Sequence, residues 1–470
     1  MKSRYNWHNI FSKPERYFVL VAIIFGFIFI FLTPPFQGPD EQAHFSQVYR
    51  YSEGKLSPSS DLPRGVVRTF KAVFYEDDIR FKANEKYDLR RTKRALLNIP
   101  LEQNIRVNGA PYSGTTYSPI VYLPQIAVVF VGRLVNMPVI LLLYMARVAS
   151  LASFITLMYL AIKYISVARW PLFVAGIIPM SLFSASMVSS DSVTLGASAL
   201  FIALIIGTFT SKSSMSRKSI LVLIFATILL AMTKLVSMVL LPILLLIVLK
   251  KNLVKERRKA LILALALLGI GLLTAIAWQV IASANSGSIN ASLPQHVVPA
   301  EQIKLIILEP QKFLFALWNT YFYSWGDSVA YSFIGTFGWA DTTMALPFVI
   351  TGYTILVLTF LANRAKDAEL LSFRGKSNRI VLALVILLYV IGVNAAMFVF
   401  YSPVDFNIIV GVQGRYFIPA LFLLAVFAAN SDQLVIKEKA YKFIVKIMPI
   451  LLLSVSALYI FFRFYIDTRI

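Results

Sequence analysis

The chain has 470 residues, of which 58% are hydrophobic and only 14% charged, and it carries a net charge of +22 and no cysteine. With a mean hydropathy of +0.72, this composition excludes a soluble globular protein and indicates a polytopic membrane protein. The missing cysteine excludes thiol catalysis, disulfides and thiolate metal sites. Lys and Arg are concentrated in short loops between apolar runs, as in cytoplasmic loops, so the positive charge does not indicate nucleic acid as a partner.

The first apolar run, over residues 17–33, predicts a transmembrane helix with its N-terminus in the cytoplasm. Basic residues precede the run and no small-residue cleavage site follows it, so we expect this helix to be retained. The following stretch, residues 34–137, is polar and of mixed charge and predicts a long first external loop. Within it, residues 119–136 contain Pro124 and Arg133 and predict a helix that lies at the outer interface of the membrane rather than a span.

Later apolar runs predict the remaining spans. Residues 219–248 are too long for one span, and Lys234 in their middle predicts two short helices with this lysine at the outer tip. Residues 283–344 are rich in aromatic side chains and predict a second external region. The other predicted spans are 138–163, 171–187, 192–210, 260–282, 345–362, 380–400, 416–430 and 443–462. The sequence therefore predicts a single all-α integral membrane domain over residues 1–470, with about eleven transmembrane helices and a long first external loop that carries interfacial helices.

Two acids and a histidine follow the first predicted span, at its outer end. Pro39 suits the first turn of a helix, where Asp40 and Glu41 would meet the positive end of the helix dipole. His44 lies one turn after Asp40, on the same face. The pattern fits an acid-capped helix start, and it also fits a preorganised carboxylate at the membrane surface. In the second interpretation Asp40 is the catalytic carboxylate, and Glu41 and His44 support it.

Further polar residues are candidates for substrate binding. Arg147 lies about three turns into its predicted span and is either a functional group or a structural partner of an acid such as Asp191. Asp191 begins a predicted helix, where it either binds substrate or caps the helix. Lys234 either contacts a lipid phosphate or marks a hydrated turn. Asp341, in the second external region, is a further candidate.

The segment from Gly411 to Pro419 places Arg415 beside glycines at the outer mouth of a predicted span. Arginine can bind phosphate through two parallel hydrogen bonds, and glycine allows the backbone to approach an anion closely. We therefore expect Arg415, with Gln413 and Tyr416, to bind a phosphate. The alternative is a glycine turn in which Arg415 and Tyr416 anchor the helix end at the interface.

A metal site has weaker support in the sequence. Asp40, Glu41 and His44 are too few ligands for a zinc ion or a hard cation, so a tightly bound metal is not expected, and a loosely held divalent cation is left open. The chain also lacks the nucleotide-binding motifs GxxxxGK[ST] and, after a strand, GxGxxG.

Five motifs stand out along the chain, namely Pro39 to Phe45, Tyr117 to Pro124, Ser189 to Asp191, Gly338 to Asp341 and Gln413 to Pro419. Together they resemble the bacterial membrane family called domain of unknown function 2142. Their order is also similar to that of the C-type glycosyltransferase (GT-C) superfamily. That resemblance implies that Asp40 orients or deprotonates the acceptor and that Arg415 binds the donor phosphate. Asp191 is a looser match to a second acid, and Arg147 lies in a segment similar to one found in these enzymes.

The resemblance implies a GT-C-like glycosyltransferase in the bacterial cell membrane, with its active site on the external face. Its partners would be a polyprenyl-phosphate sugar as donor, a glycan or lipid-linked acceptor, and the lipid bilayer. Such a donor carries a good leaving group, so one carboxylate and one or two cations at the membrane surface suffice for the chemistry. A glycolipid transporter or flippase and a noncatalytic subunit of envelope glycan assembly are the alternatives.

Overall fold

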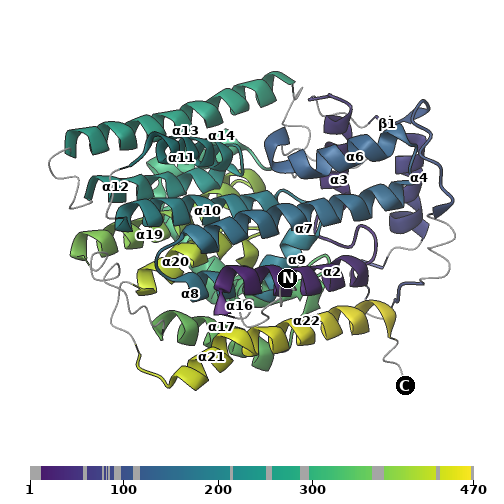
Figure 1. Cartoon of the computed structure of the whole chain (residues 1–470). Helices are drawn as coiled ribbons and strands as arrows, with labels where there is room; N and C mark the ends of the chain where they lie inside the picture. The colour runs from purple at the N-terminus through teal and green to yellow at the C-terminus, as the bar shows by residue number, and fades with distance from the viewer. Residues whose placement is uncertain are drawn as a thin grey trace, which may run out of the picture.

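The computed structural model describes residues 12–56, 61–76, 79–80, 82, 85–88, 97–108, 117–211, 215–249, 257–285, 296–362, 375–429 and 434–466. These residues form a bundle of helices with two short antiparallel sheets of two strands each (Figure 1).

Three long helices form the centre of the bundle. α2 (Pro14–Leu32) and α10 (Asp191–Thr210) both pack against α7 (Val139–Tyr164), and Figure 1 shows α7 and α10 running side by side. α10 is apolar on all of its faces, which is typical of a helix surrounded by protein, and nearly all of its side chains are buried. One large hydrophobic core includes Phe29 of α2 and Phe201 of α10.

Six helical segments in the described part of the chain are long and apolar enough to cross a membrane. They are α2, α7, α10, α13 (Arg257–Asn285), α19 (Lys376–Tyr401) and the pair α21 (Glu438–Lys446) and α22 (Met448–Tyr465). Shorter apolar helical segments lie at Pro119–Leu134, Leu235–Leu249, Leu346–Leu361 and Gly414–Ala429. The all-α membrane architecture agrees with the prediction, but the expected number of about eleven spans is not confirmed.

The run at 171–187, predicted to be one span, forms two short helices instead. α8 (Arg169–Ile177) is followed by α9 (Pro179–Ser186). Between them Ile178 has φ −54° and ψ 145°, outside the helical region. A proline disfavours helical geometry in the residue before it, so Pro179 breaks the helix at this point.

The run at 219–248 has the predicted break at Lys234. α11 (Arg217–Ala231) ends before this lysine, and the chain continues as the 3-10 helix η3 (Leu235–Leu244) and then α12 (Leu245–Leu249). Pro242 lies inside η3, where it cannot donate a backbone hydrogen bond. Lys234 therefore lies at the turn between two short helical segments.

The described part of the predicted first external loop forms a layer at one end of the bundle (Figure 1). Its elements are α3 (Glu41–Ser52), the strand β1 (Leu62–Pro63), α4 (Arg64–Lys71), the π-helical turn η1 (Ala72–Glu76), the strand β2 (Arg106–Val107), the 3-10 turn η2 (Pro119–Tyr122) and α6 (Leu123–Leu134). β1 and β2 pair as a two-stranded antiparallel sheet, although α4 and η1 lie between them in the chain. α6 has 12 residues, or about 18 Å, which is too short to cross a hydrocarbon core of about 30 Å. η2 and α6 together form the apolar segment Pro119–Leu134, and its predicted interfacial position stays a prediction.

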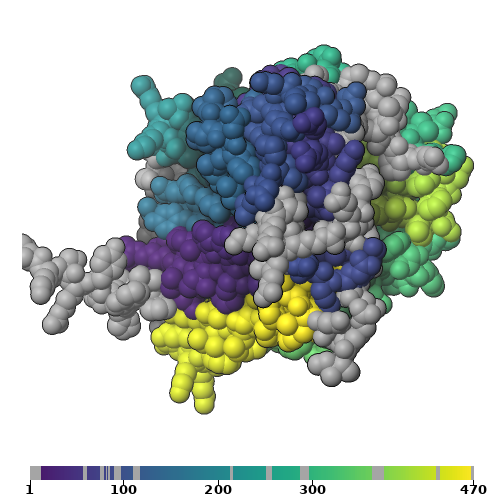
Figure 2. Space-filling view, turned by 90° about the vertical axis from the view of Figure 1, so that its right-hand side faces the viewer, coloured from purple at the N-terminus to yellow at the C-terminus, as the bar shows by residue number. Residues whose placement is uncertain are grey.

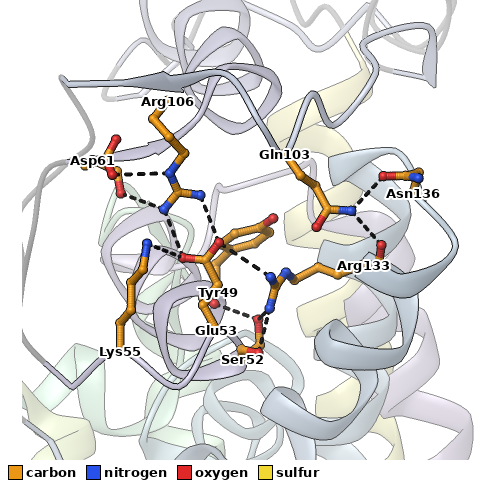
Figure 3. A network of polar contacts seen from close by, with 9 residues as sticks. All are labelled: Tyr49, Ser52, Glu53, Lys55, Asp61, Gln103, Arg106, Arg133 and Asn136. Carbon is orange, nitrogen blue, oxygen red and sulfur yellow. Dashed lines mark hydrogen bonds and ion pairs between the residues drawn. The ribbon is translucent and has the colours of Figure 1, made fainter.

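A polar network ties the end of α3 to the rest of this layer (Figure 3). Glu53, the residue after α3, accepts two hydrogen bonds from Arg106, at 2.8 and 2.9 Å, and lies 3.5 Å from Arg133 of α6. Arg133 also donates to the carbonyl oxygen of Ser52 at 2.6 Å. The network thereby holds β2 and α6 against the end of α3 and fixes the helix that carries His44.

The predicted second external region is mainly helical in its described part. Its elements are α14 (Pro299–Leu308), α15 (Pro310–Asn319), the π-helical turn η6 (Thr320–Ser324), α16 (Gly326–Ile334) and the antiparallel hairpin of β3 (Thr336–Phe337) and β4 (Thr342–Thr343). Trp339, at the hairpin turn, donates from Nε1 to the carbonyl oxygen of Phe36 at 3.1 Å. The two predicted external regions therefore meet. Figure 2 looks onto this end and shows first-loop residues in blue beside later segments in green and yellow.

Three further helical elements lie in the second half of the chain. They are α17 (Leu346–Leu361), the 3-10 turn η7 (Gly414–Phe417) and α20 (Ile418–Ala429).

We expect single-cysteine labelling of intact cells to separate the two ends of the bundle, because the chain has no native cysteine. A Cys at Asp405, an exposed residue after α19, should react with a membrane-impermeant thiol reagent. A Cys at Lys163, an exposed residue at the far end of α7, should not react. Lys376 and Lys439 should behave like Lys163.

The charge bias of the sequence predicts that Lys163, Lys212, Lys255, Lys376 and Lys439 all face the cytoplasm. Of these, Lys212 and Lys255 lie outside the described residues. Reaction of the Cys at 163 from outside the cell, with protein level unchanged, would contradict the predicted topology. It would mean that 119–136 crosses the membrane.

Candidate functional site

Three charged side chains from distant parts of the chain meet at the start of α10. Asp191 accepts a hydrogen bond from Lys234 Nζ through Oδ1 and another from Arg415 Nη1 through Oδ2, the latter at 3.2 Å. The side chains of Arg415 and Asp191 are only 8% and 11% exposed. Burial of a charge is unfavourable unless the charge is paired, and here one carboxylate pairs with two cations. The three residues, each predicted to bind substrate, therefore form one cluster with a surplus of positive charge.

Local structure sets the position of each group. The backbone N–H of Asp191 donates to Ser189 Oγ at 3.1 Å, and an acid in the first turn suits the dipole of α10. Arg415 lies in η7, and its Nε donates to Gln413 Oε1 at 2.8 Å. Gln413, predicted to belong to the site, thus orients the guanidinium that reaches Asp191.

Gly414 allows η7 to pack closely against α16. Its N–H donates to Ser332 Oγ at 2.7 Å. A Cβ at this position would lie 2.2 Å from the backbone nitrogen of Phe333 and 2.3 Å from the carbonyl oxygen of Val329. Because those are backbone atoms, a larger residue would displace η7 and Arg415 with it. The sequence pattern suggested that glycine serves the approach of an anion, whereas this structure shows a packing role.

Tyrosine rings surround the two cations. Lys234 Nζ lies 5.3 Å from the ring centre of Tyr416 and 5.9 Å from that of Tyr117, and Arg415 Cζ lies 5.3 Å from the ring centre of Tyr416. These distances suit cation–π attraction. Tyr416 was a predicted site residue, whereas Tyr117 was noted only within a family motif. Aromatic surroundings exclude water, so the cations attract an anion more strongly than exposed lysines and arginines do.

His44 of α3 lies beside Tyr117 and a further tyrosine, Tyr122. Its Nδ1 is 2.7 Å from the hydroxyl of Tyr122, and its ring stacks on Tyr117 with ring centres 5.9 Å apart. Burial lowers the pKa of His44 to about 4; the two neighbouring cations act in the same direction and the neighbouring carboxylates oppose them. The imidazole is therefore neutral at neutral pH and can act as a hydrogen-bond partner or accept a proton.

Asp40 lies at the edge of the cluster, with its side chain exposed. It precedes α3, has φ 54° and ψ 18°, and makes no capping hydrogen bond with its carboxylate. The helix begins at Glu41, so the prediction that Asp40 lies in the first helical turn is wrong. Left-handed geometry, which Asp tolerates better than most residues, turns the chain just before α3. Asp40 is close enough to His44 and Arg415 for its charge to act on both.

Glu41 and Arg147 form a separate, closed ion pair. Both side chains are 0% exposed, and Arg147 donates from Nε and Nη2 to the two oxygens of Glu41 at 2.7 and 2.6 Å. The backbone N–H of Val188 also donates to Glu41, at 3.0 Å. The remaining guanidinium donors bond to the carbonyl oxygens of Ile30, Thr33 and Pro34.

This arrangement favours a structural role for the pair. All five N–H donors of Arg147 are used, so none is left for a ligand. Arg147 pairs with Glu41, whereas the sequence had suggested Asp191 as a structural partner. The substrate contact predicted for Arg147 and the catalytic support predicted for Glu41 therefore gain no support from the geometry. The pair instead joins the end of α2 to α7 and to the start of α3.

Asp341 belongs to a third group of contacts. Its Oδ2 accepts from Arg463 Nη2 of α22 at 2.9 Å, and Arg463 also donates to the carbonyl oxygens of Ile79 and Glu85, at 2.6 and 3.2 Å. The structure thus places Asp341 at the contact between α22 and the first loop, apart from the Asp191 cluster. Its predicted role in substrate binding gains no support from this position. Arg463 was not predicted as a site residue, because a lone arginine at the end of an apolar run also fits an interfacial anchor.

The described residues contain no group of three or more His, Asp or Glu side chains placed to hold a metal ion. Asp191 is the most buried acid of the cluster, and its carboxylate is already bound by Lys234 and Arg415. Those positive charges repel a divalent cation at the same oxygens. At Asp40, Glu41 and His44, where the sequence left a loosely held cation open, the Glu41 carboxylate is bound by Arg147, so these three side chains do not form a shared donor set.

We expect His44 to make the stability of the protein rise with pH between about 4 and 6.5. The folded imidazole titrates at about 4 and the unfolded one at its ordinary pKa of 6.5, so the unfolded state binds more protons in this window. The contribution is complete above pH 6.5 and is lost as the pH falls toward 4. His44→Gln removes the titrating group and should flatten the pH dependence of the melting temperature there.

The matched control is His296→Gln, because His296 is an exposed histidine elsewhere in the chain. It should keep the wild-type profile. A profile for His44→Gln identical to that of the wild type would show that the His44 imidazole does not titrate below its ordinary range.

Six long apolar helical segments, with a cluster of buried charges and tyrosines at one end, define a polytopic helical membrane protein. The chain belongs to the family described as Predicted membrane protein (DUF2142), whose family model matches residues 23–424. This match confirms the resemblance to domain of unknown function 2142 that the sequence motifs carry. No curated protein and no solved structure matches the chain.

Proposed function

We propose that the protein is a membrane glycosyltransferase that moves a sugar from a polyprenyl-phosphate carrier to an envelope glycan or lipid-linked acceptor on the external face of the bacterial cell membrane. The observation that carries this proposal is the open carboxylate of Asp40 beside a fixed pair of cations, Lys234 and Arg415. A carboxylate can accept a proton from a hydroxyl, and two cations can stabilise a phosphate leaving group. The resemblance of the motif order to GT-C glycosyltransferases leads to the same assignment.

The donor phosphate binds, in this proposal, to Lys234 and Arg415. Asp191 and Gln413 hold the two cations in place, so little reorganisation is needed when the phosphate arrives. Arg415 donates from Nη1 to Asp191 and from Nε to Gln413. Its Nη2 takes part in neither of these two hydrogen bonds. Arginine has five donors and lysine three, so both can bind a phosphate while keeping Asp191.

The acceptor hydroxyl is positioned by Asp40 and by His44, which is neutral. The bond between the sugar C1 and the phosphate oxygen breaks with its electron pair going to the phosphate, and the acceptor oxygen forms a new bond to C1. The hydroxyl proton passes to Asp40. An ordinary carboxylate is a weak base toward an alcohol, so this proton transfer occurs late, after much of the C1–O bond has broken.

The placement of the polar groups favours an enzyme over a transporter. A transporter for a glycolipid would place open polar groups near the middle of the membrane. Arg147, the arginine predicted to lie within a span, has no donor left for a substrate. The cluster of Asp191, Lys234 and Arg415 lies instead against the first-loop layer, beside His44.

The test is sugar release from undecaprenyl-phosphate hexoses, supplied one at a time to the purified protein in proteoliposomes with an envelope-glycan extract. We expect labelled sugar to leave the lipid and appear on the extract. Movement of intact donor across the bilayer without cleavage would identify a flippase instead. Absence of both transfer and donor binding, in folded protein, would overturn the proposal and favour a noncatalytic subunit.

We expect Arg415→Lys to weaken donor binding and Arg415→Ala to weaken it more. Lysine keeps the charge but loses the planar fork that binds phosphate and Asp191 together. One charged hydrogen bond contributes about 1.5–3 kcal/mol, or roughly 10- to 150-fold in affinity. Binding of undecaprenyl phosphate to the detergent-solubilised protein measures the effect directly.

The matched control is the same pair of substitutions at Arg169, an exposed arginine at the start of α8. Affinity should stay at the wild-type value there. Equal affinity for wild type, Arg415→Lys and Arg415→Ala would remove Arg415 from the donor site.

A further inference from the structure

Two residues between α2 and α3 have left-handed backbones although neither is glycine. Phe36 has φ 59°, and Asp40, four residues later, has φ 54°. Aspartate tolerates this region, whereas a bulky residue such as phenylalanine adopts it only where its surroundings hold it in place. Residues 36–40, the Asp40 turn, therefore depend on contacts with other parts of the chain.

The ring of Phe36 is anchored in the first-loop layer. It is fully buried and packs against Phe45 of α3, Phe70 of α4 and Phe74 of η1, with ring centres 5.6, 5.0 and 6.3 Å away. The first two of these contacts are edge-on, an arrangement that aromatic pairs prefer. The contacts fix where the side chain lies. The peptide group that follows Phe36 needs a polar partner of its own, because it is buried with the side chain.

Trp339 supplies that partner from the second external region. Its Nε1 donates to the carbonyl oxygen of Phe36 at 3.1 Å, across 303 positions of sequence. The indole is itself held in place. It packs edge-on against Phe74, with ring centres 6.4 Å apart, and Arg80 Cζ lies 5.2 Å from its centre, which suits cation–π attraction. A fixed donor thus reaches the backbone of the Asp40 turn.

The motif from Gly338 to Asp341 builds the hairpin turn that presents Trp339. Gly338 has φ 65°, and a Cβ at this position would clash with the Asp341 carboxylate. That carboxylate is bound by Arg463 of α22, which ties the turn to the bundle. The proposed chemistry assigns this motif no role, whereas the contacts give it one: it holds the indole N–H against the Asp40 turn.

We propose that Trp339 is a positioning residue for Asp40. Its hydrogen bond to Phe36 holds the Asp40 turn in the conformation that presents the Asp40 carboxylate to the acceptor hydroxyl. The inference rests on the proposed function for the catalytic role of Asp40. It adds a residue of the second external region that acts on turnover and not on donor binding. A misplacement of about 1 Å can cost roughly 100-fold in rate, so a contact that fixes one turn is sufficient for a large effect.

The test uses Trp339→Phe, which keeps an aromatic ring against Phe74 and removes the indole N–H. We expect kcat for sugar transfer to fall about 10-fold or more and KM for the donor to stay at the wild-type value. Trp170→Phe is the matched control, because Trp170 of α8 also packs edge-on against a phenylalanine, Phe173, and beside a cation, Lys446. It should leave kcat unchanged. With Trp339 replaced by β-(3-benzothienyl)alanine, which keeps the shape of the indole and lacks its N–H, the loss should match that of Trp339→Phe.

A double variant distinguishes positioning from a general structural defect. If Trp339 acts through Asp40, Trp339→Phe should lower turnover little further in an Asp40→Asn protein. A defect that does not involve Asp40 would lower turnover by the same factor in both backgrounds, and that result would overturn the inference. Unchanged kcat in both single variants at Trp339 would also overturn it, while transfer by the wild type would leave the proposed function intact.

A second measurement does not need activity. The chain has no native cysteine, so a nitroxide attached to Asp40→Cys reports the motion of the Asp40 turn alone. We expect its electron paramagnetic resonance spectrum to show greater mobility when Trp339→Phe is added and no change with Trp170→Phe. Greater mobility without any sugar transfer by the wild type would retain the positioning contact and reject the transferase. Unchanged mobility with Trp339→Phe would overturn the inference.

Discussion

Replacement of Asp40 by Asn is expected to lower sugar transfer by about 100-fold or more, the usual range for loss of a catalytic base. The substitution should leave the fold intact. The Asp40 side chain is exposed and makes no capping hydrogen bond, and Asn is among the residues that tolerate its left-handed φ of 54°. Binding of undecaprenyl phosphate should stay near the wild-type value, because Asp40 acts on the acceptor. Turnover in proteoliposomes, normalised to folded protein, gives the measurement.

Asp405→Asn is a closely matched control. Asp405 is also an exposed aspartate with a positive φ, 65°, in a turn at the end of a helix. The same chemical change there should leave turnover unaltered. Full activity in Asp40→Asn would reject the catalytic assignment, whereas an unfolded Asp40→Asn protein would point to a structural role in starting α3.

The second large effect is expected on stability, from Glu41→Gln. Glu41 is fully buried and is the only carboxylate within the described contacts of Arg147, so the neutral amide would leave a buried guanidinium without its counter-charge. Breaking one partner of such a pair typically costs about 3–5 kcal/mol. We expect a marked fall in the apparent melting temperature in detergent and a lower yield of folded protein. Any loss of transfer should follow the loss of folded protein.

Two comparisons make this expectation specific. The double variant Glu41→Gln with Arg147→Met removes both charges and should recover part of the lost stability. Glu438→Gln makes the same change at an exposed ion pair with Lys442 in α21, and it should alter stability by less than about 1 kcal/mol. A Glu41→Gln protein as stable as Glu438→Gln, with transfer strongly reduced, would restore the catalytic support that the sequence suggested for Glu41.

The helical membrane class could be predicted because whether a segment crosses a bilayer depends on the length of its own apolar run. An apolar run is either long enough to cross the hydrocarbon core or too short, and neighbouring segments do not change that length. The predicted spans at 138–163, 192–210 and 380–400 accordingly coincide with α7, α10 and α19 within a few residues. The break at Lys234 was also local information. At 171–187 the continuous apolar run predicted one span, and hydropathy did not reveal the helix break before Pro179.

The candidate site was predictable as a set of residue types and not as a set of contacts. Asp191, Lys234 and Arg415 were each singled out, because a charged group within an apolar run or at its end is costly to bury unless it has a partner. Their contact joins residues 43 and 224 positions apart in sequence. Tyr117 and Tyr122 were not assigned to the site, since tyrosines near a membrane interface are common and carry no specific signal.

The adjacent acids Asp40 and Glu41 show most clearly what the tertiary structure decided. By itself the sequence determined that both lie at a helix start beyond the first span, where the dipole favours negative charge. Local rules treat both as first-turn acids, so the catalytic role given to Asp40 and the supporting role given to Glu41 came from the family resemblance and not from the local pattern. Only the packing of α2 and α7 brought Arg147, 106 positions away, to Glu41 and enclosed that pair. Asp40, one residue earlier and left-handed, remained open to solvent beside the cations. The physical reason is that a charge pair depends on where helices meet in three dimensions, whereas hydropathy and capping depend only on near neighbours in the chain.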